Sequence, residues 1–275
     1  MKKVLRVFKE NKQFTLFFIL GLVVIGVAIF APQFAPYDPL NAVMTESLQE
    51  PSSAHPFGTD KLGRDLLSRV IFGTRTSLIM TLCLVAVIFV IGTFLGVIAG
   101  YFGGVVDAVI MRIADMMISF PGLVLAIAIA GMLGPNLVNA VISIAAVSWT
   151  KYARLARSMV LKVKKSLYIE AAVVNGTKTW KILLVHVLPN MVTQMVVTAA
   201  ADIGTMMLEL ASLSFLGFGA TAPTPEWGLM LNEGRTYMAK APWLMIYPGI
   251  AIVICVVVFN MLGDSIRDVL DPRQD

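Results

Sequence analysis

The chain has 275 residues, of which 57% are hydrophobic and only 14% charged, and its mean hydropathy is +0.81. Soluble domains carry about 25% charged residues, so this composition excludes an ordinary soluble domain and predicts an all-α integral membrane protein. The net charge of +5 does not indicate a nucleic-acid-binding protein, because the basic residues follow membrane topology instead.

The N-terminal region predicts a first transmembrane helix. Residues 1–13 are basic and form the expected cytoplasmic N-terminus, whereas residues 14–31 carry no charge. A cleaved signal peptide is the alternative. The length of the apolar run, with Pro32 directly after it, favours a membrane helix whose N-terminus is cytoplasmic.

Residues 32–77 predict a long outer loop that contains an amphipathic helix on the membrane surface. Its apolar and charged side chains fall on opposite helical faces: Leu62, Leu66, Leu67, Val70 and Ile71 on one, and Arg64, Asp65 and Arg69 on the other. His55 stands alone in this loop, which favours a loop residue over a metal ligand. Neither Cys83 nor Cys255 belongs to a disulfide or metal motif, because both lie in apolar runs.

Residues 78–275 predict a core of five further transmembrane helices. The expected spans are 78–101, 109–132, 137–159, 191–215 and 243–262, separated by Gly- and Pro-rich breaks. Six spans place both termini on one side. Only Lys61, Arg64, Arg69, Arg75, Arg235 and Lys240 among the 22 Lys and Arg residues fall in the predicted outer loops, which indicates that the termini are cytoplasmic.

A polar segment at 170–189, EAAVVNGTKTWKILLVHVLP, interrupts the apolar runs. Ala172 and Gly176 are four residues apart, so they share one helical face on which another surface can approach closely. Gly176 is expected to end this helix. A second short helix is expected from Thr177, and Pro189 marks the start of the next one.

Two acidic residues lie inside the predicted fifth span. Asp202 and Glu209 are seven residues apart and share a face with Met206, which predicts a face that lines a translocation path. The alternative is that each acid pairs with a neighbouring residue or a partner chain. Gly92, Gly96 and Gly100 form a packing face for another helix, either within this chain or in a partner.

The residues offer little for catalysis. His55 and His186 fall on opposite sides of the membrane, and no phosphate-binding P-loop motif is present. The chain is therefore expected not to be an enzyme and not to hydrolyse ATP itself. It is also expected to hold no metal.

The E-A-A motif, followed at fixed spacing by Gly176 and then Leu188-Pro189, resembles the EAA loop of bacterial ABC-importer permeases. His186 stands where many members have Ile, as in the dipeptide, oligopeptide and nickel branch. The similarity extends over nearly the whole chain, through GTD at 58–60, GRD at 63–65, YFGG at 101–104, SFP at 119–121, SFLGFG at 214–219, PEWG at 225–228 and LGDSIRDVLDPR at 262–273. The chain is identified as resembling the second, C-type permease of such an importer.

This resemblance implies a type I permease fold in the bacterial cytoplasmic membrane. It implies as partners a homologous second permease, two ATP-binding subunits that hold ATP and Mg, and an extracytoplasmic substrate-binding protein. Residues 160–190 would form the coupling loop, in which the ATPase contacts are Glu170, Ala171, Ala172, Gly176, His186 and Pro189. The loop bearing Pro223, Pro225 and Trp227 would dock the binding protein.

The cargo is the least determined part of this interpretation. The segment DIGTMML at 202–208 and the face bearing Asp202, Met206 and Glu209 favour nickel or a metal chelate over a short peptide. Import of di- or oligopeptides only is the alternative. An ATP-independent channel or secondary transporter, or a membrane enzyme, is the alternative of a different class.

Overall fold

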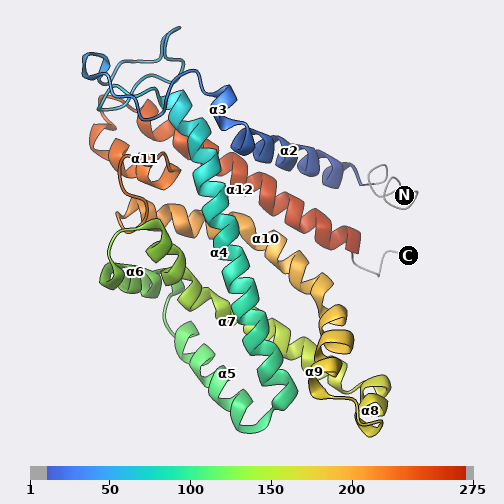
Figure 1. Cartoon of the computed structure of the whole chain (residues 1–275). Coiled ribbons are helices and arrows are strands. Elements are labelled where there is room, and N and C mark those ends of the chain that lie inside the picture. The colour runs from blue at the N-terminus through green and yellow to red at the C-terminus, as the bar shows by residue number, and fades with distance from the viewer. Residues whose placement is uncertain (1–10, 271–275) are drawn as a thin grey trace.

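The computed structural model describes residues 11–270, and this part of the chain is built from helices without a strand (Figure 1). The long helices are α2 (Lys12–Ile29), α4 (Leu66–Phe102), α7 (Leu137–Lys164), α10 (Leu188–Phe215) and α12 (Trp243–Leu270). The shorter helices are α3 (Ala31–Phe34), α5 (Gly104–Ile118), α6 (Gly122–Leu133), α8 (Leu167–Val174), α9 (Thr179–Lys181) and α11 (Trp227–Gly234). Two 3₁₀ turns, η1 (Met44–Glu46) and η3 (Arg235–Tyr237), and a π-helical turn, η2 (Ile182–Val187), complete the chain.

Four helical segments are long and apolar enough to cross a membrane: Lys12–Ile29, Leu66–Phe102, Thr179–Phe215 and Trp243–Val269. Helices α5 and α6 qualify only as a bent pair, with 93° between them. The span expected over 109–132 is therefore not one continuous helix but a pair of helices broken at 119–121. Pro121 lies directly before α6, where it lacks the N–H group that a continuous helix would need.

Helix α7 occupies the region of the predicted fourth span. It is 28 residues long, but Lys151, Arg154 and Arg157 keep it below the apolarity of the other spans. Its start agrees with the span predicted over 137–159, whereas its end at Lys164 lies beyond the predicted end. Asn136 caps it by accepting a hydrogen bond from the Val138 N–H at 2.8 Å. The count of six spans stays a prediction, because it is reached only if α7 and the bent pair of α5 and α6 each cross the membrane.

The glycine face of α4 packs within this chain, against α7. A Cβ atom on Gly92 would lie 2.5 Å from the carbonyl oxygen of Trp149, and one on Gly96 would lie 2.3 Å from that of Ala153. Only glycine leaves room for the two backbones to approach so closely. The intramolecular alternative is therefore the one that the structure shows.

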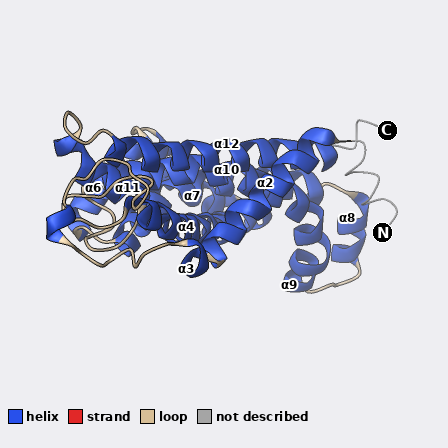
Figure 2. Ribbon diagram, turned by 90° about the horizontal axis from the view of Figure 1, so that it is seen from above, coloured by secondary structure: helices blue, strands red, loops and turns tan. Residues whose placement is uncertain are grey.

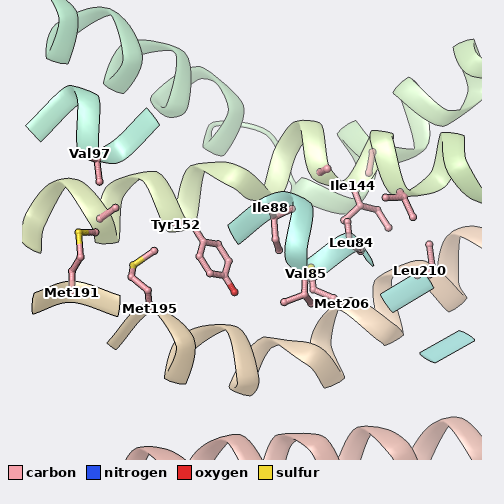
Figure 3. Close-up of a cluster of buried hydrophobic side chains, with 14 of the residues drawn as sticks. Leu84, Val85, Ile88, Val97, Ile144, Tyr152, Met191, Met195, Met206 and Leu210 are labelled. Carbon is pink, nitrogen blue, oxygen red and sulfur yellow. The ribbon is translucent and has the colours of Figure 1, made fainter. Parts of the chain in front are cut away.

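A core of apolar side chains lies where α4, α7 and α10 meet (Figure 3). Its labelled members are Leu84, Val85, Ile88, Val97, Ile144, Tyr152, Met191, Met195, Met206 and Leu210. The methionines all come from α10, and their flexible thioether chains fill the space between the other two helices.

The predicted amphipathic helix at the outer membrane surface is wrong. Helix α4 begins at Leu66, where the Asp65 carboxylate accepts from the Ser68 N–H at 2.7 Å, and then continues unbroken to Phe102. Arg64 and Arg69 are each only 1% exposed rather than facing solvent. Residue 77 is therefore no boundary between a loop domain and a membrane domain.

The described ends of the chain lie on one side of the molecule. Helix α2 packs along α12 in the opposite direction, so that Gly21 lies against Leu262 and Gln13 against Met261. Figure 2 shows α8 and α9 at this same end, opposite the loops near α6 and α11. The expected N-terminus 1–13 and the final residues lie mostly outside the described part, and their cytoplasmic placement stays a prediction.

Candidate functional site

The coupling loop has the helix end that its sequence predicts. Helix α8 is followed by Gly176 with φ of +71°, a left-handed conformation that favours glycine. The Thr177 N–H donates to the Ala172 carbonyl and the Gly176 N–H donates to the Val173 carbonyl, both at 3.0 Å. This pair of bonds is a Schellman motif, so the helix end is fixed by local backbone geometry.

The surface of this loop exposes apolar side chains. Leu167 is 82% exposed, Val174 85% and Trp180 60%. Glu170 and Ala171 are also exposed, beside the half-buried Ala172, and no atom lies within 4 Å of a Cβ built on Gly176. An apolar patch with basic and acidic neighbours is typical of a surface that another protein covers.

The chain continues from the coupling loop into α10 without a break. The expected short helix is α9, but η2 joins it directly to α10, and Pro189 falls in the first turn of α10. His186 lies within this π-helical turn, and its ring centroid is 6.2 Å from that of Tyr168 in α8. The two halves of the coupling loop therefore contact each other through these rings.

Polar contacts connect the coupling loop to the spans. Lys164, at the end of α7, donates from Nζ to the Tyr101 carbonyl of α4 at 2.6 Å. These two residues and Glu170 line a groove of about 390 Å³ against α8. Deeper in the molecule, Arg157 donates to the Asp107 carboxylate at 2.6 Å and links α7 to α5.

A charged pair lies near the middle of α7 and α10. The Lys151 ammonium donates to Asp202 Oδ1 at 2.6 Å, and the Tyr152 hydroxyl donates to Asp202 Oδ2 at 2.9 Å. Tyr152 is fully buried, and in Figure 3 its ring points from α7 toward α10. Asp202 thus has the neighbouring partner that the alternative interpretation of this acid required.

Asp202 also lines a cavity of about 260 Å³. The cavity is lined by Ile88, Met117, Ile118, Phe120, Gly122, Val147, Ser148, Thr150, Lys151, Tyr152, Asp202 and Met206. Two of the three residues predicted to share a translocation face therefore meet here, whereas Glu209 is not among the lining residues. The sequence reasoning missed Lys151, although a lysine inside a helix of membrane-spanning length is itself a signal.

The structure contradicts the prediction that Trp227 is an exposed docking anchor. Its ring is 1% exposed and lies on Gly73 of α4, and its Nε1–H donates to the Val70 carbonyl at 3.0 Å. Pro223 remains exposed and Pro225 is half-buried, so only the prolines of the predicted set reach the surface.

Glu226 forms the cap of α11. Its carboxylate accepts from the Gly228 and Leu229 N–H groups at 2.9 and 2.8 Å. Burial raises the pKa of the Glu226 carboxyl above its ordinary value, and these hydrogen bonds oppose the shift in part.

A buried charge cluster, not found from the sequence, joins the outer loop to α11. Asp60 Oδ2 accepts from Arg64 Nε at 2.6 Å and lies 3.5 Å from Arg69 Nε. Glu233 Oε2 lies 3.3 Å from Arg64 and 3.5 Å from Arg69. Two arginines thus share two carboxylates, and this sharing explains how the arginines tolerate burial.

Comparison with protein families agrees with this architecture. Residues 92–275 match the family described as "Binding-protein-dependent transport system inner membrane component", and residues 1–51 match the "N-terminal TM domain of oligopeptide transport permease C". The inward-facing MetNI methionine ABC transporter has a similar fold, with a TM-score of 0.60 and 20% identity over 74% of this chain and 97% of that one.

Relatives with assigned names indicate the branch of the family to which this chain belongs. A dipeptide transport permease, DppC, of Alkalihalophilus pseudofirmus is 44% identical, covering 93% of this chain and 85% of the relative. A glutathione transport permease, GsiD, of Pectobacterium atrosepticum is 46% identical over 92% and 84%. A probable D,D-dipeptide permease, DdpC, of Escherichia coli is 45% identical over 89% and 82%. The chain therefore belongs to the dipeptide and oligopeptide permeases of ABC importers, which are multi-pass subunits of the inner membrane.

Proposed function

We propose that this chain is one of two homologous permease subunits that move short peptides from a binding protein into the cell. The observation that carries the proposal is the similarity over more than nine-tenths of the chain to permeases named for dipeptides and glutathione. An importer of this kind works with ATP-binding subunits and a substrate-binding protein. The second permease and two ATPases per complex are part of the proposal.

The coupling loop is the proposed contact with the ATPase. Two short helices at one end of the molecule, α8 with Leu167 and Val174 and α9 with Trp180, expose these apolar side chains. Glu170 adds one acid among basic neighbours. A channel or secondary transporter would gain nothing from this exposed surface, so its presence supports the ATP-driven alternative.

The mid-membrane charges favour a peptide over a metal ion. The preference for nickel was based on the segment at 202–208 and on the face bearing Asp202, Met206 and Glu209, whose carboxylates attract cations. Lys151 neutralises that carboxylate at 2.6 Å, and the exposed ammonium repels a free divalent cation. A peptide carries both a positive and a negative end, so it suits a path that presents both charges.

Uptake assays separate the two cargo classes. The complete complex should be expressed in cells that lack other peptide and nickel importers, and labelled dipeptide and labelled nickel should be supplied in turn, the latter with and without chelators. We expect ATP-dependent dipeptide uptake. Nickel uptake without dipeptide uptake at matched expression would reject the peptide proposal.

Topology is tested by two single cysteines in a chain whose Cys83 and Cys255 are replaced by alanine. Thr221→Cys lies in the exposed outer loop, and Val174→Cys lies on the coupling loop and is 85% exposed in the native residue. A membrane-impermeant thiol reagent should label the first in intact cells and the second only in inverted vesicles. The opposite pattern would reverse the proposed orientation.

A further inference from the structure

Lys151 is an exposed charge near the middle of α7, the helix that corresponds to the predicted fourth span. It lies near the centre of α7, a 28-residue helix, yet 60% of its side chain is exposed. A lysine at this depth is costly against lipid and instead faces a bundle interior or a water-filled cavity. This face of α7 is therefore not a lipid-facing surface.

The two members of the pair are held differently. The Asp202 side chain is 8% exposed and is also bound by the Tyr152 hydroxyl, so the carboxylate is fixed inside the protein. Among residues 11–270, Asp202 is the only acid within ion-pair distance of Lys151, and Glu209 interacts with both charges at longer range. The Lys151 side chain is otherwise 60% exposed. The ammonium is thus the member that is free to move.

The cavity beside the pair is smaller than a typical pocket for a drug-sized ligand. Its volume of about 260 Å³ is below the roughly 300 Å³ at which pockets for whole drug-sized ligands begin. Apart from the charged pair and three hydroxyl-bearing residues, its walls are apolar side chains such as Ile88, Phe120 and Met206. One charged end of a peptide and the apolar side chain next to it fit this lining.

We propose that the Lys151 ammonium leaves the Asp202 carboxylate and binds instead the terminal carboxylate of a peptide in transit. This inference rests on the proposed peptide function. The ammonium leaves one carboxylate for another, so the number of charge-assisted contacts is conserved, and Tyr152 keeps its hydrogen bond to Asp202. Because Asp202 competes for the same ammonium, the bound peptide is released again, as transport requires.

A series at position 151 tests this in proteoliposomes that contain the complete complex, its binding protein and ATP. Lys151→Arg should keep labelled dipeptide uptake within about threefold of wild type, because the cation remains. Lys151→Gln should lower it about tenfold or more, the typical effect of losing one charge-assisted hydrogen bond. Lys151→Glu should lower it further, because a like charge then meets the cargo carboxylate.

A charge swap separates cargo binding from a structural role. Lys151→Asp combined with Asp202→Lys keeps opposite charges at both positions but exposes a carboxylate on the path. We expect this variant to remain low in dipeptide uptake. Recovery of wild-type uptake by the swap would show that only the ion pair matters and would overturn the proposal.

Four other outcomes also decide the question. Wild-type uptake by Lys151→Gln, or greater uptake by Lys151→Glu than by Lys151→Gln, would overturn the carboxylate site alone. Failure of the Lys151→Gln chain to purify with its partner subunits would also overturn it, in favour of a role in assembly. Absence of dipeptide uptake by the wild-type complex would instead reject the proposed function, and this inference with it.

Discussion

The two ends of the molecule differ in how far their large side chains are buried within this chain. At the outer end, Arg64, Arg69 and Trp227 are each only 1% exposed, and their polar atoms bond within the chain. At the coupling loop, Leu167 and Val174 are more than 80% exposed. The predicted outer end therefore buries these side chains within the chain, whereas the coupling loop leaves its apolar side chains exposed.

Helix α4 joins these two ends. It is 37 residues long, about 55 Å at 1.5 Å per residue, and runs from the buried arginines to Tyr101 beside the coupling loop. Helix α4 is therefore a continuous element between the two ends. The comparison predicts that changes at the coupling loop abolish transport without unfolding the chain, and that changes at the outer end act through stability.

The largest expected effect comes from Gly176→Asp. The residue has φ of +71°, and no atom lies within 4 Å of an added Cβ, so the change meets no clash within this chain. It distorts the helix end and places a charge on the proposed ATPase contact. We expect membrane insertion to remain and dipeptide uptake and transport-linked ATP hydrolysis to fall below detection.

Gly217→Asp is the matched control. Gly217 also has positive φ, +93°, and open space around it, but it lies at the end of α10, outside the coupling loop. Its N–H and that of Phe218 form the same Schellman motif, donating to the Ser214 and Leu213 carbonyls. Uptake should stay measurable in this variant. Normal uptake by a well-expressed Gly176→Asp chain, or equal loss in both variants, would refute a specific coupling role for Gly176.

At the outer end, Asp60→Asn is expected to be the most destabilising change. It leaves Arg64 and Arg69, both buried, to share the single carboxylate of Glu233. Breaking a buried charge group in this way costs about 3–5 kcal/mol of unfolding free energy. Thermal unfolding of the purified chain in detergent measures the loss.

Glu50→Gln controls for a change of net charge in the same outer loop. Glu50 is exposed, so its replacement should alter the unfolding free energy by about 0.5 kcal/mol or less. A similar unfolding midpoint for both variants would show that the buried cluster does not stabilise the outer end.

Features fixed by neighbouring residues were predictable from the sequence. Gly176 ends α8 because its backbone conformation is local, and the coupling loop therefore has the expected form. Apolar runs placed most of the long helices for the same reason. The bend between α5 and α6 was missed, although Pro121 stood at the break, because the apolar run continues through it.

Features that depend on distant residues were not predictable. Arg64 and Arg69 appeared to be a solvent-facing stripe because Glu233, more than 160 residues further along, was not visible as their partner. Trp227 appeared to be an exposed anchor because the space above Gly73 arises only in the folded chain. The charge of Asp202 could be assessed only once Lys151 was seen beside it.

A smaller effect is expected from Gly73→Ala. The added Cβ would lie 2.6 Å from the Trp227 ring, so the ring must shift from its packed position on α4. Such overpacking costs about 1–3 kcal/mol. Gly249→Ala in α12 is the control, because nothing lies within 4 Å of its Cβ, and it should be neutral or slightly stabilising. Equal unfolding midpoints for the two variants would contradict tight packing under Trp227.

The smallest effect concerns the pH dependence of the outer end. Burial raises the pKa of Glu226 above its ordinary value of 4.5, so the folded chain holds this proton over a pH range in which the unfolded chain has lost it. The contribution of Glu226 to stability is therefore greatest below pH 4.5 and falls as the pH rises from 4.5 to the raised pKa, by at most about 1.4 kcal/mol per pH unit.

Glu226→Gln removes this titration while keeping a side-chain oxygen to accept from the Gly228 or Leu229 N–H. The variant should gain stability relative to wild type as the pH is raised from 4.5, even if losing one capping bond weakens it at every pH. Thermal midpoints of both proteins, measured in detergent across this range, give the difference in slope. Parallel pH profiles would show that Glu226 titrates alike in the folded and unfolded chains, and that the outer end is less closed to solvent than its burial indicates.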